Sequence, residues 1–170
     1  MSPYAVAKTS AYWLVNNYRD AYGLFACTGI LFNHESPLRP ERFVTQKIIR
    51  AVKRIAEGSG EKLKLGRLDI ARDWGWAPEY VEAMWLMLQQ DMPQDFVIAT
   101  GTTITLEEFV KTAFEQASLN WKDHVIQDPS LFRPTDLAIG RADPSKAHQK
   151  LNWEASTKGV EVVKKMYQSL

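Results

Sequence analysis

The sequence has 170 residues, of which 45% are hydrophobic and 24% charged, which is typical of a folded domain and not of a disordered chain. Its 21 Lys and Arg residues against 20 Asp and Glu residues give a formal net charge of +1, which argues against nucleic acid as a partner. A single cysteine excludes an internal disulfide, and the sequence shows neither a signal-peptide pattern nor an apolar run that could span a membrane. We therefore expect a cytoplasmic protein.

The amino-terminal stretch predicts a helix followed by a strand. Apolar residues recur at helical spacing over residues 4–21, and Gly23 predicts the end of that helix. The continuous apolar run LFACTGILF, residues 24–32, predicts a buried parallel strand in which Cys27 would be a small buried side chain. Two prolines and several charges in residues 33–43 predict a loop at the carboxyl end of this strand.

The middle of the chain predicts further alternation of helix and strand. Residues 43–58 predict an amphipathic helix whose basic side chains form a solvated face, and residues 62–66 predict a short strand. A turn over 67–78 leads to a helix over 78–90 that is strongly apolar on one face, and residues 95–100 predict a second short buried strand.

The last third predicts mostly helix. Residues 105–117 predict a helix with Thr105 as its cap and Glu108 closing a capping box. Residues 119–142 predict irregular structure with at most one short strand, and two helices are expected after them. Strands that alternate with helices indicate an α/β architecture, although about three strands are few for a doubly wound sheet.

Tyr4 and Lys8 stand one helical turn apart in SPYAVAK, residues 2–8. Because they are related as i and i+4, both side chains project from one face of the helix. A neighbouring ammonium group favours the phenolate form of a tyrosine, so this pair could act as an acid/base group. The spacing alone is equally that of an ordinary amphipathic first turn.

A metal site is not expected from this sequence. The three histidines, His34, His124 and His148, are scattered, and Cys27 has no cysteine near it. No serine or cysteine nucleophile stands in a recognisable hydrolase arrangement, and no glycine-rich dinucleotide turn follows a strand.

Several motifs together resemble one family. They occur in the order SPYAVAK, GILFNHESP, FVTQKI, RDWG, MWLMLQQ, DFVIATG, FRPTD and DPSKAHQKLNW. This order is similar to that of the GDP-mannose 4,6-dehydratases, extended short-chain dehydrogenases/reductases that act on nucleotide sugars. The resemblance runs from Ser2 to about Trp153 and implies the carboxy-terminal part of the family's length, without the region that carries the glycine-rich turn.

The fold implied by the resemblance is α/β. It is the carboxy-terminal half of a Rossmann-type extended short-chain dehydrogenase, with an incomplete parallel sheet and a small mixed α/β substrate lobe. Residues 1–60 would be the remnant of the dinucleotide-binding domain. Residues 61–170 would be mainly the sugar-nucleotide lobe, with chain crossings between the two.

The resemblance also assigns catalytic and cofactor-binding residues. Tyr4 corresponds to the catalytic tyrosine, which takes the proton from the sugar 4-hydroxyl as hydride leaves C4 for NADP, and Lys8 corresponds to its partner lysine. Water is then eliminated across C5–C6, and the hydride returns to C6. Both residues would also contact NADP, together with His34 and Arg39. The family's catalytic Thr and Glu lie upstream of SPYAVAK and match no residue here.

The substrate-binding residues implied by the resemblance are Asn33, Lys47, Gly66, Arg72, Arg133 and Asp136. Cationic donors suit a nucleotide diphosphate because they form charge-assisted hydrogen bonds with phosphate oxygens. The sequence departs from the family at two places. Leu38, Arg39 and Pro40 stand where many members have two arginines and a glycine in a loop that reaches a neighbouring subunit, and Asp136 replaces a glutamate. In RDWG, Asp73 and Trp74 could equally be structural, as a turn-capping carboxylate and a packed ring.

The resemblance therefore predicts an NADP-dependent lyase that converts GDP-mannose to GDP-4-keto-6-deoxymannose and water. The intact family forms homo-oligomers, and a separate chain could supply the amino-terminal half. We expect the isolated chain to be inactive and to bind NADP weakly or not at all. Two alternatives remain open: a non-catalytic fragment that binds a sugar nucleotide, and a dehydratase or epimerase for another nucleotide sugar.

Overall fold

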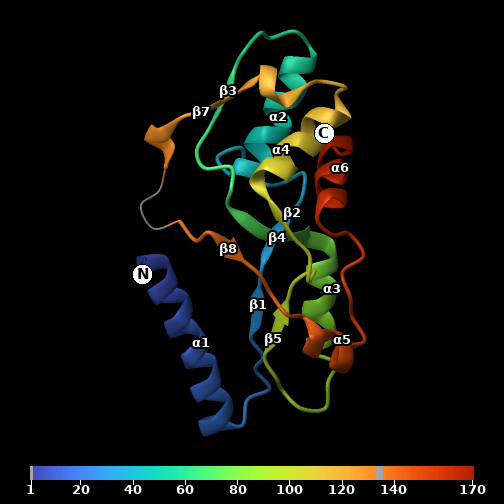
Figure 1. Ribbon diagram of the computed structural model, residues 1–170. Helices are drawn as coiled ribbons and strands as arrows, with labels where there is room; N and C mark the ends of the chain where they lie inside the picture. The colour runs from blue at the N-terminus through green and yellow to red at the C-terminus, as the bar shows by residue number, and fades with distance from the viewer. Residues whose placement is uncertain (1, 133–135) are drawn as a thin grey trace.

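A computed structural model of the chain describes residues 2–132 and 136–170 (Figure 1). Its α-helices are α1 (Pro3–Tyr22), α2 (Val44–Ala56), α3 (Ala77–Met87), α4 (Leu106–Gln116), α5 (Ser145–Leu151) and α6 (Val160–Gln168). Its strands are β1 (Gly29–Leu31), β2 (Asn33–Glu35), β3 (Leu63–Leu65), β4 (Ala71–Trp76), β5 (Phe96–Ile98), β6 (Thr103–Thr105), β7 (Val125–Gln127) and β8 (Ile139–Gly140), and the short 3-10 turns are η1 (Trp121–Asp123) and η2 (Pro129–Leu131). Each predicted helix is present, and its bounds differ from the expected ones by at most a few residues.

Within the part of the chain that the structure describes, the strands form three small sheets that are mainly parallel. β1 pairs with β5, and β3 pairs with β7, both in parallel. The largest sheet has the order β2-β4-β6, in which β2 runs parallel and β6 antiparallel to β4, and β8 also pairs with β4 in parallel. The α/β class is confirmed.

Four predictions of secondary structure were wrong. Residues 33–35 form β2 and not a loop, and residues 71–76 form β4, the central strand of the largest sheet, and not a turn. Both segments contain polar residues, so neither shows the apolar pattern of a buried strand. They are strands because β2 pairs with β4, and β4 also pairs with β6 and β8. The expected strand over 24–32 is reduced to Gly29–Leu31, because its partner β5 offers only three residues for pairing. Residues 119–142 carry two short strands, β7 and β8, because each finds a partner far away in the chain.

The apolar interior consists of two clusters. The larger one gathers the apolar faces of α2, α4 and α6 around β3 and β4, and the rings of Trp74 and Phe109 lie 5.2 Å apart within it. The smaller one joins α3 and α5 with β5 and with Trp153. Cys27 packs against the smaller cluster but is only half-buried, in contrast to the expectation of full burial.

Helix α1 runs along one side of the molecule, at the left of Figure 1, and none of its residues is buried. The Ser2 hydroxyl caps its start by accepting a hydrogen bond from the Ala5 amide, and Gly23 ends it in the left-handed conformation, as predicted. Arg19 attaches α1 to the rest of the molecule. Its guanidinium donates two hydrogen bonds, 2.8 and 2.9 Å long, to the carboxylate of Asp95. The helix is therefore held at its carboxyl end.

The predicted capping box of α4 is confirmed: the Thr105 hydroxyl accepts from the Glu108 amide, and the Glu108 carboxylate accepts from the Thr105 amide. Among residues 2–132 and 136–170, no helix is long and apolar enough to cross a membrane. In the same part of the chain, no cluster of His, Cys, Asp and Glu could hold a metal ion.

Candidate functional site

Tyr4 and Lys8 lie on one face of α1, as their spacing predicts. The ammonium nitrogen of Lys8 lies 5.7 Å from the centre of the Tyr4 ring, and Tyr4 is 72% exposed. Within the described residues, no hydrogen bond or ion pair links either side chain to another predicted site residue. The pair is thus accessible and geometrically intact.

Asn33 and His34 follow β1 after a single residue, Phe32, at the carboxyl end of the parallel β1–β5 pair, where ligands of α/β sheets usually bind. In β2 they stand opposite Trp74 and Gly75 of β4. The Nδ1 atom of His34 lies 2.8 Å from the Phe32 carbonyl oxygen. Since a carbonyl can only accept, Nδ1 carries a proton in this contact, which leaves Nε2 as the ring nitrogen available to a ligand.

Tyr80, which sequence reasoning did not select, packs against His34 in this segment. Its fully buried ring lies 5.0 Å from the ring of His34 and contacts the edge of Trp153. A Cβ atom at Gly75 would lie only 2.3 Å from the Tyr80 ring, so the glycine of RDWG is required by this close approach. Burial raises the pKa of the Tyr80 phenol, and the carboxylate of Asp73 adds to that rise.

Arg72 and Asp136, 64 positions apart, are brought together. The guanidinium Nη2 of Arg72 lies 3.2 Å from Oδ1 of Asp136, and both side chains are largely buried. Nη1 donates to the carbonyl oxygen of Ala71 at 2.8 Å. The arginine side chain is therefore held at a fixed position near the start of β4, beside β8.

Lys47 and Gly66 also lie near each other. Lys47, in the first turns of α2, donates from Nζ to the carbonyl oxygen of Lys64, two residues before Gly66. A Cβ atom at Gly66 would lie 3.0 Å from the carbonyl oxygen of Leu131, so a side chain there would push the two backbones apart by a few tenths of an ångström. The remaining predicted residue, Arg133, lies outside the described residues.

Asp73 and Trp74 of RDWG are structural. The fully buried carboxylate of Asp73 accepts hydrogen bonds from the amide and hydroxyl of Thr100, at 3.0 and 2.8 Å, and from the Gly101 amide at 2.8 Å. It thereby fixes the turn that follows β5. Trp74 packs in the larger apolar cluster.

Arg39 turns back toward the end of β2. Its guanidinium carbon lies 3.8 Å from the centre of the Phe43 ring, and its Nε lies 3.3 Å from the carboxylate of Glu35. Glu35 is 1% exposed and accepts a 2.8 Å hydrogen bond from the hydroxyl of Thr45. Burial raises the pKa of Glu35, with the charge of Arg39 and the hydrogen bond from Thr45 acting against it.

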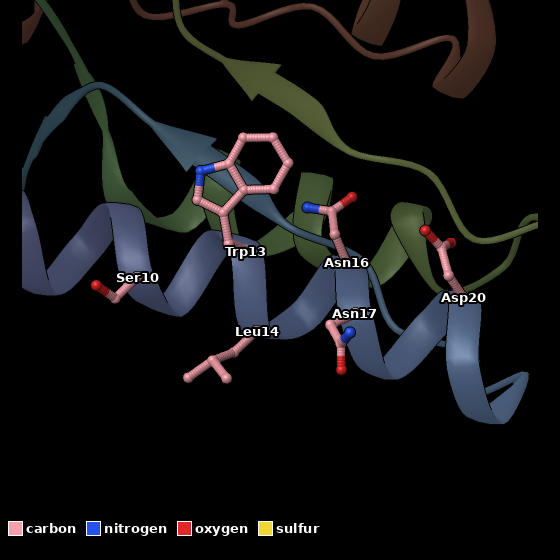
Figure 2. A pocket seen from close by; sticks show the side chains of 6 residues that line it. All are labelled: Ser10, Trp13, Leu14, Asn16, Asn17 and Asp20. Carbon is pink, nitrogen blue, oxygen red and sulfur yellow. The ribbon is translucent and has the colours of Figure 1, made fainter.

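A shallow hollow lies elsewhere, on the surface of α1. Figure 2 shows that the side chains lining it all project from α1, with Trp13 and Asn16 on one side of the helix and Leu14 and Asn17 on the other. It contains none of the predicted site residues. It is the open surface of a single helix and not a cleft between elements.

Comparison with known proteins identifies the family. The family model described as GDP-mannose 4,6 dehydratase matches residues 1–166. The chain belongs to the GDP-mannose 4,6-dehydratase family. It is 53% identical over 165 residues to GDP-mannose 4,6 dehydratase 1 of Arabidopsis thaliana, covering 97% of this chain and 46% of that protein. It is 48% identical over 185 residues to GDP-mannose 4,6 dehydratase of Cricetulus griseus, covering 99% of this chain and 50% of that one.

This chain of the dehydratase family spans about half the length of the curated relatives it matches, in agreement with the expected partial match. Among solved structures it resembles RMD from Pseudomonas aeruginosa complexed with NADPH, with a TM-score of 0.87 at 19% identity over 99% of this chain and 56% of that chain. It also resembles dTDP-glucose 4,6-dehydratase from Bacillus anthracis in complex with NAD, with a TM-score of 0.85 at 19% identity over 99% of this chain and 52% of that chain. Identities this low show the fold alone, which is that of the predicted Rossmann-type enzymes.

Proposed function

We propose that this chain supplies the Tyr–Lys pair and the sugar-nucleotide-binding part of a GDP-mannose 4,6-dehydratase. The observation that carries this proposal is the family match over residues 1–166, which includes every predicted site residue. Within the chain, residues 1–60 are proposed to belong to the dinucleotide-binding domain and residues 61–170 mainly to the substrate lobe. The complete enzyme is proposed to be a homo-oligomer.

Tyr4 is proposed as the catalytic acid/base and Lys8 as its partner. The phenol would take the proton from the sugar 4-hydroxyl, and the exposure of Tyr4 leaves it accessible to a substrate. The ammonium nitrogen of Lys8 lies 5.7 Å from the centre of the Tyr4 ring, on the same face of α1, as the proposed pair requires. When bound, NADP would supply the capacity to accept hydride from C4 and return it to C6.

The residues present fit a nicotinamide cofactor. Lys8 and Arg39 offer cationic donors, and His34, whose Nδ1 is engaged by the Phe32 carbonyl, offers its Nε2. Such groups suit the phosphates, ribose hydroxyls and carboxamide of a dinucleotide. NADP in place of NAD follows from the family resemblance.

The GDP diphosphate is proposed to bind Arg72, Lys47 and Asn33, together with Arg133. The Asp136 carboxylate holds the Arg72 guanidinium in place, so less side-chain freedom is lost when a phosphate binds. Gly66 keeps the backbone near Leu131 free of a side chain. Asp136 is proposed to face the guanosine in the role that a glutamate has in the family.

A complementation assay tests this function. The chain is mixed with GDP-mannose and NADP, alone and together with a separately produced chain that supplies the rest of the Arabidopsis thaliana relative, and the 4-keto-6-deoxy product is measured. We expect no turnover alone and turnover in the mixture. Tyr4→Phe should abolish the activity, whereas Tyr18→Phe, a matched change on the same helix, should not. Unchanged turnover with Tyr4→Phe would show that Tyr4 is not the catalytic base.

A second candidate is a non-catalytic sugar-nucleotide-binding chain, in which the Arg72 guanidinium held by Asp136 would be the phosphate-binding group. It predicts that the chain alone binds GDP-mannose, that Arg72→Ala weakens this binding, and that no complementing chain restores turnover. Isothermal titration with GDP-mannose, run beside the assay, separates the two candidates.

A further inference from the structure

A buried carboxylate that the proposed chemistry does not use stands at the end of β2. Glu35 is 1% exposed, yet it follows directly after Asn33 and His34. Burying a carboxylate is unfavourable unless it is paired and hydrogen-bonded. Two partners compensate it: the hydroxyl of Thr45, 2.8 Å away in the first turn of α2, and Nε of Arg39 at 3.3 Å.

Arg39 is held from two directions. Glu35 faces its Nε, and the ring of Phe43 lies 3.8 Å beneath its guanidinium carbon. Within residues 2–132 and 136–170, its guanidinium makes no hydrogen bond, so the contact of Nε with Glu35 is an ion pair, and its side chain is 27% exposed. The outer edge of a guanidinium, with its parallel N–H groups, is the part that binds a phosphate or carboxylate in two places at once.

The loop of residues 36–43, which joins β2 to α2, is held by hydrogen bonds within its own backbone. The Arg39 amide donates to the Ser36 carbonyl, and the Phe43 amide donates to the Pro40 carbonyl. The Glu35 carboxylate therefore connects the end of β2, the middle of this loop and the start of α2. A charge at this point fixes the direction of the Arg39 side chain, which would otherwise sample many rotamers.

We infer that Glu35 is a positioning residue that orients the guanidinium of Arg39 toward a phosphate-bearing ligand. This inference rests on the proposed function, in which Arg39 contacts the phosphates of the cofactor. Glu35 itself, being buried, does not touch the ligand. Its carboxylate acts through Arg39, and its contact with Thr45 anchors it to α2.

Nuclear magnetic resonance on the full chain tests the orientation directly. The Nε–Hε signal of Arg39 is compared in the wild type, Glu35→Gln and the matched control Thr45→Val, which leaves the Glu35–Arg39 contact in place. We expect Glu35→Gln to shift this signal, because it removes the carboxylate charge 3.3 Å from Nε, and Thr45→Val to leave it near its wild-type position. A signal that moves equally in both variants would overturn the inference, because Glu35 would then act only on the fold.

A double-variant cycle tests the consequence for binding, with NADP as the probe and with the complementing chain of the assay above present in every sample. Arg39→Ala should weaken binding by about tenfold or more, the size expected for lost hydrogen bonds to a charged group. Glu35→Gln should weaken it several-fold, and Glu35→Gln/Arg39→Ala no further than Arg39→Ala alone. An additional loss in the double variant would refute action through Arg39. If Arg39→Ala leaves binding unchanged while Glu35→Gln still shifts the Arg39 signal, the orientation stands and the proposed cofactor contact fails.

Discussion

Replacement of Gly75 by alanine introduces one methyl group at the most crowded point beside the candidate site. The new Cβ would lie 2.3 Å from Cε2, 2.5 Å from Oη and 2.7 Å from Cζ of Tyr80. Ordinary contacts between carbon atoms are about 3.5–4.0 Å, so the ring would have to move by about 1 Å. It cannot do so freely, because it is fully buried between His34 and Trp153.

The expected loss follows from this overlap. An extra methylene in a well-packed core destabilises a protein by about 1–3 kcal/mol, and overlap with three atoms places Gly75→Ala at the upper end, about 3 kcal/mol. For a chain of this size each kcal/mol lowers the melting temperature by roughly 2–4 °C. The variant should therefore melt roughly 6–12 °C below the wild type. Its backbone dihedrals contribute little, since Gly75 is not among the glycines with positive φ.

Urea unfolding followed by tryptophan fluorescence and circular dichroism measures this loss. Tyr80→Leu removes the obstructing ring, so Gly75→Ala and Tyr80→Leu together should lose less than the sum of the single changes, by at least about 1 kcal/mol. Gly23→Ala is the control for backbone strain alone, because nothing lies within 4 Å of its Cβ while its φ is +62°. Strict additivity, or a loss below about 0.5 kcal/mol for Gly75→Ala, would refute the packing argument.

Three further changes have defined outcomes. Asp73→Asn places an amide nitrogen, which cannot accept, against the donors of Thr100; we expect a loss of about 1–3 kcal/mol in urea unfolding, and a loss near zero would contradict the structural role. Burial acts to raise the pKa of Asp95, but the hydrogen bonds from Arg19 and the charge of that residue lower it overall. Stability from this pair is therefore complete above about pH 4 and falls as the pH drops through the lower, folded-state pKa. The stability–pH profile of Asp95→Asn should be shallower in that acid range, and an unchanged slope would exclude this ion pair as its source. Thr105→Ala removes the cap of α4 and should cost about 1 kcal/mol, read from the same unfolding curves.

Part of the site could be predicted from the sequence because it is local. The Tyr4–Lys8 spacing fixes one face of a helix, and the structure places both side chains there. The resemblance also selected Arg72 and Asp136, although the sequence held no sign that they form an ion pair. Sequence reasoning missed Glu35 and Tyr80. An acidic residue in a charged stretch is normally exposed to solvent, and a tyrosine on an amphipathic helix is normally an ordinary core residue.

The sequence by itself determined the helices and their ends. Gly23 and the Thr105–Glu108 box act through dihedral angles and hydrogen bonds within a few residues of each other, so their pattern is sufficient. Only the tertiary structure decided that residues 71–76 form the central strand. A strand exists through its partners, and β4 acquires β2, β6 and β8 from segments about 30 to 70 positions away. The same long-range pairing places Asn33 beside Trp74 and buries Glu35, because backbone hydrogen bonds between distant segments set the register that no local pattern records.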